Sequence, residues 1–191
     1  MIKVITGPMF SGKSEQLIAN IELCKNKYKN IKYFKPSLDT RDKDYIKTRA
    51  SNRVYKATLI KNLSDIKNNI DEDTELVVID EAQFLKGNIA EITDLYLKNV
   101  DFLIAGLSST SDQQPFGIMP DILSIATDIV VLKAKCVICG DLAEFTKTND
   151  KKLDTIDCNL NYFPVCRKCM KLCDKNGRII QYLCINIQKF G

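Results

Sequence analysis

Residues 7–14 read Gly7-Pro8-Met9-Phe10-Ser11-Gly12-Lys13-Ser14 and match the pattern G-x-x-x-x-G-K-[ST] in full. The stretch follows a short predicted strand, Ile2 to Ile5, and a helical pattern begins at Ser14. Glycines in such a loop let successive backbone N–H groups turn toward phosphates, and the helix N-terminus adds a favourable dipole. We therefore predict a phosphate-binding loop (P-loop), in which Lys13 neutralises the β- and γ-phosphates and Ser14 holds Mg²⁺.

The apolar pattern after this loop alternates between strands and helices up to residue 132. Short apolar runs predict further strands at Ile31 to Lys35, Glu75 to Asp80, Phe102 to Ala105 and Ile129 to Leu132. Helical spacing predicts faces that carry Leu59, Leu63, Ile66 and Ile70, then Ile89, Ile92, Leu95 and Tyr96, then Ile122 and Ile125. We predict an α/β domain over residues 1–132 with a parallel sheet of about five strands, and a mobile polar loop from Ser37 to Arg53.

An acidic pair ends the apolar run Leu76-Val77-Val78-Ile79-Asp80-Glu81. A strand of a parallel sheet delivers such carboxylates from its carboxyl end to the crevice above the sheet. We predict that Asp80 acts on the Mg²⁺ shell and that Glu81 accepts a proton from an attacking hydroxyl or water. Together with the loop, the pair indicates a nucleoside triphosphate and magnesium, although ATPases, GTPases, helicases and kinases share both elements.

The cysteines are placed unevenly, since seven of the eight lie after residue 135. Four of them make two C-x₂-C pairs separated by 26 residues, Cys136 with Cys139 and Cys166 with Cys169. Four thiolates at this spacing are typical of a closed structural zinc site rather than of a disulfide scaffold. Cys173 is an alternative ligand, and Cys24 and Cys184 are expected to fill apolar positions. We predict a zinc-ribbon-like lobe over residues 133–191.

Composition limits the classes of function. The chain has 191 residues and a mass of 21.7 kDa, which suits one substantial core with a small appendage. It contains no histidine, so Ser-His-Asp and Cys-His catalysis and histidine metal ligands are excluded. No apolar run approaches the roughly 18 to 20 residues that span a bilayer, and no signal-peptide core is visible. We therefore expect a cytoplasmic protein without a membrane partner.

These features together resemble the type II thymidine kinase family, which joins a phosphate-loop domain to a small zinc lobe. The resemblance covers nearly the whole chain. It is carried by residues 7–14, by both cysteine pairs, and by Asp39-Thr40-Arg41, Asp80-Glu81-Ala82-Gln83-Phe84, Pro115-Phe116-Gly117 and Tyr162 ahead of Val165-Cys166-Arg167. It implies an enzyme that transfers the γ-phosphoryl group of ATP to the 5′-hydroxyl of thymidine.

The resemblance also implies roles for individual residues. Glu81 matches the catalytic base of the family, and the set that binds Mg-ATP would be residues 7–14 with Asp39, Arg41, Asp80 and Gln83. A lasso loop from Thr146 to Tyr162 would close over the base. The nucleoside would contact Met9, Phe84, Leu107, Phe116, Thr146, Ile156, Asp157 and Tyr162. Members of the family are usually homotetramers that the end product dTTP inhibits.

Two departures from the family pattern fall on the nucleoside side. Gly106-Leu107-Ser108 stands where the family has G-L-D, and Ser111 stands where it has an aromatic residue. Asp157-Cys158 replaces a glycine pair that often precedes the tyrosine. Thymidine is the expected substrate and deoxyuridine the near competitor, because the two differ by one methyl group, worth about 1 to 3 kcal/mol of discrimination.

Two other functions fit parts of the sequence. Residues 1–132 hold 17 basic and 18 acidic residues, whereas residues 133–191 hold 11 and 6, so a P-loop ATPase that docks nucleic acid on a basic zinc lobe is one alternative. The basic residues are dispersed, which does not favour it, and salt-sensitive binding of DNA or RNA would support it. The other alternative, a non-catalytic nucleotide-binding member of the family, would not need the positioned base Glu81.

Overall fold

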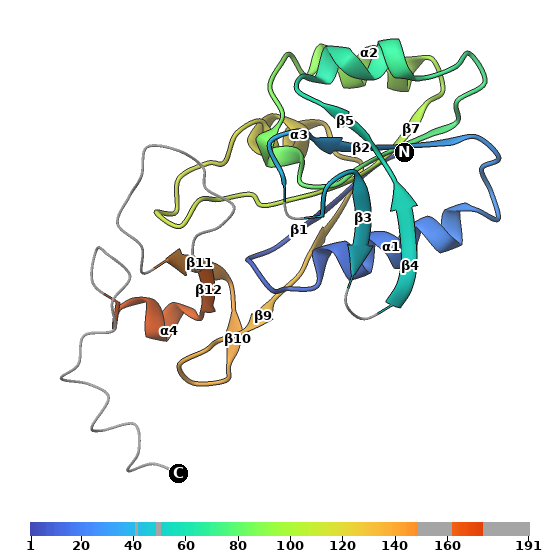
Figure 1. Cartoon of the computed structure of the whole chain (residues 1–191). Helices are drawn as coiled ribbons and strands as arrows, with labels where there is room; N and C mark the ends of the chain where they lie inside the picture. Colours follow the sequence, from blue (N-terminus) through green and yellow to red (C-terminus); the bar gives the residue numbers. More distant parts are fainter. Residues whose placement is uncertain (41, 49–50, 149–161, 174–191) are drawn as a thin grey trace.

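A parallel sheet of six strands forms the centre of the protein (Figure 1). The computed structural model describes residues 1–40, 42–48, 51–148 and 162–173. The strand order is β5-β2-β6-β7-β1-β8, and every neighbouring pair runs parallel. The bounds are β1 (Ile2–Thr6), β2 (Ile31–Pro36), β5 (Thr58–Ile60), β6 (Leu76–Ile79), β7 (Asp101–Gly106) and β8 (Asp128–Val131). The predicted α/β class is confirmed, with one strand more than expected.

Helical segments cover both faces of this sheet. Helix α1 (Lys13–Cys24) packs Leu17 and Ile21 on one face, against sheet residues such as Val78 and Leu103. The other face is covered by the 3₁₀ helix η1 (Leu63–Asn69), α2 (Ala90–Leu97) and α3 (Met119–Ile125). Figure 1 shows α2 and α1 on opposite sides of the strands. Because both faces are covered, the central strand β6 is apolar and buried along its whole length, as its continuous apolar run indicated.

The prediction of a mobile loop from Ser37 to Arg53 was wrong. Part of this segment forms an antiparallel hairpin, β3 (Tyr45–Thr48) with β4 (Ser51–Lys56). The hairpin is anchored because Ile46 is fully buried and Tyr55 nearly so, in the cluster that contains α1. Tyr55 also stacks on Tyr33 with ring centroids 5.1 Å apart. A few apolar residues among many charged ones were enough to dock the hairpin, although they left no clear period in the sequence.

A second prediction, of one helix through Leu59, Leu63, Ile66 and Ile70, was also wrong. The segment is divided between strand β5, which pairs with β2, and the 3₁₀ helix η1. Asn62 separates the two, and the Asp65 carboxylate accepts the backbone N–H groups of Lys61 and Asn62 over 2.9 Å each. This cap begins η1 at Leu63 and excludes a continuous helix. The helix after the loop ends at Cys24, so Tyr28 lies beyond it.

Beyond β8 the chain forms a small lobe with a core of its own. It contains β9 (Ala134–Lys135), β10 (Leu142–Ala143), β11 (Phe145–Thr148), β12 (Tyr162–Val165) and α4 (Arg167–Met170). Strand β9 pairs with β10, and β11 pairs with β12, both antiparallel. The buried residues of its hydrophobic core are Ala134, Ala143, Val165 and three cysteines. We call this part the cysteine lobe. Within the described residues, no helix is long and apolar enough to cross a membrane.

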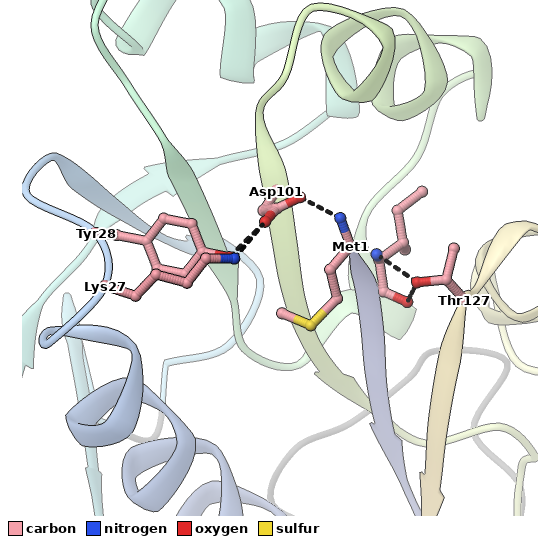
Figure 2. Close-up of polar contacts among 6 residues, drawn as sticks. Met1, Lys27, Tyr28, Asp101 and Thr127 are labelled. Carbon is pink, nitrogen blue, oxygen red and sulfur yellow. Dashed lines mark hydrogen bonds and ion pairs between the residues drawn. The ribbon is translucent and has the colours of Figure 1, made fainter.

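The amino ends of the central strands are tied together at one edge of the sheet (Figure 2). Asp101, at the start of β7, accepts hydrogen bonds from the Met1 amino group and from the Tyr28 hydroxyl. The Thr127 hydroxyl joins the start of β8 to Ile2, whose N–H it accepts over 2.9 Å. Burial raises the pKa of Asp101, but these hydrogen bonds outweigh it and hold the pKa below its usual value. The opposite edge, at the carboxyl ends of the strands, carries the candidate site.

Candidate active site

The Gly7 to Ser14 loop connects β1 to α1 and closes around the amine of Lys13. Lys13 Nζ donates to the carbonyl oxygens of Gly7, over 3.1 Å, and Pro8, over 2.8 Å, and the residue is only 8% exposed. The turn depends on glycine at two positions. A Cβ on Gly7 would lie 2.5 Å from the Leu132 carbonyl oxygen, and Gly12 has a φ of 82°. The loop therefore has the strand–loop–helix context that the sequence pattern predicted.

Two features of this loop suit an anionic ligand. The Ser11 hydroxyl is buried and has no hydrogen-bond partner among the described residues, so it is available to a ligand oxygen. Ser14 lies in the first turn of α1, where N–H groups at the helix N-terminus favour negative charge. Phe10, in contrast, has a φ of 62° and is 70% exposed, so its side chain points to solvent. Its predicted place in the Mg-ATP set stays a prediction.

The acidic pair lies directly beyond β6. Asp80 is 5% exposed, and its Oδ1 accepts the N–H of Glu81 over 3.0 Å. Burial, and then the charge of Glu81, raise the pKa of Asp80 to about 7, against the opposing effect of Lys35. The charged form of a buried carboxylate is stabilised when its oxygen binds a divalent cation, so the site fits the expected Mg²⁺. Glu81 has a φ of 54°, a left-handed conformation that is uncommon for a side-chain-bearing residue and that clusters at functional sites.

Gln83 holds Glu81 against the end of the neighbouring strand. It lies in the short 3₁₀ helix η2 (Ala82–Phe84) and is 2% exposed. Its Nε2 donates to Glu81 Oε2 over 2.6 Å, and its Oε1 accepts the Leu107 N–H over 3.0 Å. Gly117, with a φ of 53°, allows this close packing, because a Cβ there would lie 2.0 Å from the Gln83 carbonyl oxygen. The sequence placed Gln83 among the Mg-ATP ligands, whereas its side chain is hydrogen-bonded to Glu81 and to Leu107, which follows β7.

Asp39, which the family motif predicts to lie near the phosphates, is buried, at 3% exposure, and forms an ion pair with Lys35 over 3.2 Å. Sequence reasoning missed Lys35. A lysine on a short strand is normally predicted to be exposed, and no local sequence pattern indicated that this one is buried. Arg41, the third residue of the Asp39-Thr40-Arg41 motif, lies outside the described residues.

Several of the residues predicted to contact the nucleoside are aromatic or apolar and lie near the end of β7. The rings of Phe84 and Phe116 meet edge to face, with centroids 5.6 Å apart and planes at 89°. Leu107 and Phe116 are each 8% exposed, and the Phe116 N–H donates to the Ser108 carbonyl oxygen over 3.1 Å. A cavity of about 180 Å³ opens beside them, lined by Gly7, Pro8, Leu107, Ser108, Ser109, Val131, Leu132, Lys133 and Glu144. The geometry provides an apolar wall next to the loop.

The cysteine lobe contacts the loop directly. The Met9 N–H donates to Thr146 Oγ1 over 2.9 Å, and Thr146, on β11, is 4% exposed. Gln113 Nε2 donates to the Thr146 carbonyl oxygen over 3.2 Å. Tyr162 pairs with Thr148 across the β11–β12 hairpin, so it lies on the same side of the hairpin as Thr146. Of the predicted nucleoside set, Met9 and Thr146 are therefore brought together, whereas Ile156 and Asp157 lie outside the described residues.

Four cysteines form a cluster with the geometry of a metal site. The Sγ atoms of Cys136, Cys139, Cys166 and Cys169 all lie within 4.8 Å of one another. Four sulfurs bound at about 2.3 Å to one tetrahedral zinc ion lie roughly 3.8 Å apart, so the cluster fits zinc after small adjustments. Burial raises the pKa of the Cys136 thiol, but backbone N–H groups outweigh it and bring the pKa to about 7.

The other cysteines stand apart from this cluster. Cys173 Sγ donates to the Cys169 carbonyl oxygen over 3.6 Å, and Cys173 does not belong to the cluster, so the alternative ligand is not supported. Cys24 is half-buried and packs against the core beside α1, as expected. Cys158 and Cys184 lie outside the described residues.

Comparison with known proteins agrees with this geometry. The model of the family described as thymidine kinase matches residues 1–170. The thymidine kinase of Mycoplasma mobile is 37% identical over 174 residues, which cover 88% of this chain and 86% of that protein. That of Metamycoplasma arthritidis is 36% identical over 176 residues, 88% of this chain and 89% of the relative. That of Bacteroides thetaiotaomicron is 35% identical over 173 residues, 88% and 85% of the two chains.

Proposed function

Because the chain belongs to the thymidine kinase family, we propose that it transfers the γ-phosphoryl group of ATP to the 5′-hydroxyl of thymidine, with Glu81 as general base. The family match and the named relatives support thymidine phosphorylation. The observation that carries the assignment of the base is the position of Glu81. Its carboxylate is fixed by Gln83 over 2.6 Å, at the same sheet edge where the Gly7 to Ser14 loop leaves β1.

The phosphate groups of ATP are assigned to the Gly7 to Ser14 loop. Its backbone N–H groups and the α1 N-terminus supply donors, and the amine of Lys13 supplies a positive charge. Asp80 and Ser14 are the residues that would hold Mg²⁺, which when bound neutralises charge on the β- and γ-phosphates. The buried Asp80 side chain supports this role, because its charged form lacks the solvation that a cation would replace.

Glu81 acts on the nucleoside. The 5′-hydroxyl oxygen attacks the γ-phosphorus as its proton passes to the Glu81 carboxylate, and the bond to the β-phosphate oxygen breaks to release ADP. The products are ADP, thymidine monophosphate and one proton. Gln83 keeps the carboxylate in place during this step, because its amide donates to Glu81 and is itself held by Leu107. Asp39 and Arg41 are assigned near the transferred phosphate by the family motif.

The base is assigned to the apolar wall formed by Phe84, Phe116 and Leu107, and Met9 is assigned to the same pocket by the family resemblance. The edge-to-face contact of the two rings holds each ring in a fixed orientation and supports a rigid apolar wall. The thymine methyl group gives thymidine an advantage over deoxyuridine of about 1 to 3 kcal/mol when it fills such a wall. The segment predicted to close over the nucleoside contains four further predicted contacts, which are Thr146, Ile156, Asp157 and Tyr162.

The cysteine lobe is assigned a structural zinc ion. Four thiolates leave no open coordination position for a substrate, so the metal would hold the fold and take no part in transfer. The hydrogen bond from Met9 to Thr146 then connects the metal-stabilised hairpin to the phosphate loop. The domain boundary between residues 132 and 133, the homotetramer, inhibition by dTTP and the cytoplasmic location all stay predictions.

The two alternatives lose support. The family match does not favour an ATPase that acts on nucleic acid. A non-catalytic role is not favoured either, because Lys13, Asp80, Glu81 and Gln83 are buried or hydrogen-bonded in an arrangement that suits transfer.

The proposal is tested by measuring Mg-ATP-dependent phosphorylation of thymidine, deoxyuridine, deoxycytidine and uridine side by side. We expect transfer to thymidine first and to deoxyuridine at a lower kcat/KM. Transfer to thymidine would show that Ser108 and Ser111 are tolerated in the pocket. ATP binding without transfer to any of the four nucleosides would favour the non-catalytic alternative.

A further inference from the structure

Lys35 is a buried lysine to which the proposed reaction assigns no role. It lies near the end of β2, is 1% exposed, and is among the largest fully buried side chains of the described residues. A buried ammonium group is costly unless charged and polar partners surround it. Its Nζ lies 3.2 Å from Asp39 Oδ2 and 3.2 Å from the Tyr45 carbonyl oxygen.

The sheet register explains why this charge is near the acidic pair. Phe34 on β2 is paired with Ile79 on β6, and both side chains belong to the core cluster on the α2 face. The next residues along, Lys35 and Asp80, therefore both turn to the opposite face, at the ends of adjacent strands. The Asp80 N–H donates to the Phe34 carbonyl oxygen over 3.1 Å, which extends the pairing to this point.

Lys35 also holds both ends of the segment that carries Asp39. Asp39 lies four residues after Lys35, and its N–H donates to the Pro36 carbonyl oxygen over 3.0 Å. Tyr45, the second partner, is the first residue of the β3–β4 hairpin. One ammonium group thus joins the end of β2, the turn at Asp39 and the start of the docked hairpin.

Without the positive charge of Lys35, the Asp39 carboxylate would be repelled by the neighbouring carboxylates. It is 3% exposed and close enough to Asp80 for their charges to interact, and Glu81 adds a third carboxylate. Three carboxylates at one sheet edge repel one another unless a positive charge lies among them. Lys35 supplies that charge from inside the protein, where a substrate does not displace it.

We propose that Lys35 is a positioning residue for phosphoryl transfer, which fixes Asp39 beside the Asp80–Glu81 pair without itself touching the substrate. The inference rests on the proposed function, since Asp39 matters for transfer only if the chain phosphorylates thymidine at this edge. A positioning role for Lys35 differs from a purely stabilising role in its effect on turnover. A buried ion pair that serves the fold alone can be replaced by neutral residues without loss of turnover in the folded protein.

The test compares four variants of the full chain with the wild type: Lys35→Met, Asp39→Asn, the double variant, and Lys32→Met as a matched control. Lys32 lies on the same strand, forms an ion pair with the exposed Asp71 and is away from the site. Urea unfolding first establishes conditions in which each variant is folded. Thymidine kinase activity then gives kcat and the KM values for ATP and thymidine.

We expect Lys35→Met to lower kcat by about tenfold to a hundredfold, because a small displacement of a positioned group has effects of this size. Both KM values should change by less than about threefold. Because Lys35 acts through Asp39, the double variant should have the same kcat as Asp39→Asn. Lys32→Met should keep the wild-type kcat.

A folded Lys35→Met variant with wild-type kcat would overturn the inference, and so would a double variant whose kcat falls well below that of Asp39→Asn. If Lys35→Met does not fold, a double variant whose kcat falls well below that of Asp39→Asn still overturns the inference, because the double variant has no unpaired buried charge. If the wild type and Lys32→Met both bind ATP but phosphorylate no nucleoside, the proposed function itself fails, and the role of Lys35 fails with it.

Discussion

Gln83 donates a hydrogen bond from Nε2 to Glu81 Oε2 over 2.6 Å, and the same amide accepts the Leu107 N–H over 3.0 Å. The carboxylate proposed as the base is therefore fixed to the end of β7 by a residue two positions along the chain. A side-chain amide suits this task, because it donates to a carboxylate and carries no charge of its own. Orientation of the base is thus built into the turn after β6.

Replacing Gln83 tests this orientation. Gln83→Met keeps the length of the side chain but removes both hydrogen bonds. We expect kcat to fall by about tenfold to a hundredfold, with the KM for ATP changed by less than about threefold, because phosphate binding does not depend on this contact. Steady-state kinetics on protein shown by circular dichroism to be folded checks the result. An unchanged kcat would mean that Glu81 needs no partner or is not the base.

The contact between the cysteine lobe and the phosphate loop gives a second prediction. Thr146→Val removes the oxygen that accepts the Met9 N–H and leaves that partly buried group without its partner. A loss of about 1 kcal/mol is typical of such a change, which corresponds to roughly a fivefold lower kcat/KM for ATP. Thr146→Ser keeps the hydroxyl and is the matched control, so it should retain most of the wild-type value. Equal losses in both variants would assign the effect to packing.

The cysteine cluster predicts a linked loss of metal and stability. Cys166→Ser removes one of the four sulfurs, so zinc content and the thermal unfolding midpoint should both fall. Cys173→Ser, four residues beyond Cys169 and outside the cluster, should leave zinc content unchanged. Metal analysis by mass spectrometry and thermal unfolding measure the two effects. Unchanged zinc in Cys166→Ser would exclude the four-cysteine assignment.

Asp80 gives a prediction about pH. Its pKa is raised to about 7 in the folded protein, above the value of about 3.9 in an unfolded chain. The folded state therefore binds this proton more tightly, and the stability it contributes is full below about pH 4 and is lost as the pH rises through about 7. Without nucleotide at pH 8, Asp80→Asn should unfold at a higher urea concentration than the wild type. Its free energy of unfolding should be larger by on the order of 1 to 3 kcal/mol. The variant should also be inactive.

The control for this prediction is the same pair of proteins at low pH. Near pH 4 the wild-type carboxyl carries its proton, so the two urea midpoints should be close. A constant difference between the two proteins from pH 4 to pH 8 would contradict the assigned charge state of Asp80.

Sequence patterns predicted the features that depend on local chemistry. The apolar runs located β1, β2, β6, β7 and β8, and the reason is clearest for β6, whose four residues are all buried in the covered sheet. The spacing of the two C-x₂-C pairs identified the four sulfurs that the structure brings together. The loop and the acidic pair were placed correctly at the carboxyl ends of strands, since the topology of parallel sheets leaves them no other edge.

Features that depend on tertiary contacts were not predictable in this way. The β3–β4 hairpin is polar along most of its length, and it is anchored by Ile46 and Tyr55, which are buried in the cluster that contains α1. Lys35 has the local sequence of an exposed strand residue, and its burial follows from the register of β2 with β6 and from the hairpin over it. The direction of the Gln83 amide likewise depends on Leu107 and Gly117, which lie on other elements.

The most direct test of the account is phosphoryl transfer by Glu81→Gln, measured with radiolabelled ATP and thymidine beside the wild type. The matched control is Glu72→Gln, because Glu72 is exposed and lies before β6, away from the site. We predict that Glu81→Gln binds ATP with wild-type affinity and loses transfer by at least about a hundredfold, whereas Glu72→Gln keeps full activity. Transfer at the wild-type rate in Glu81→Gln would contradict the assignment of the base.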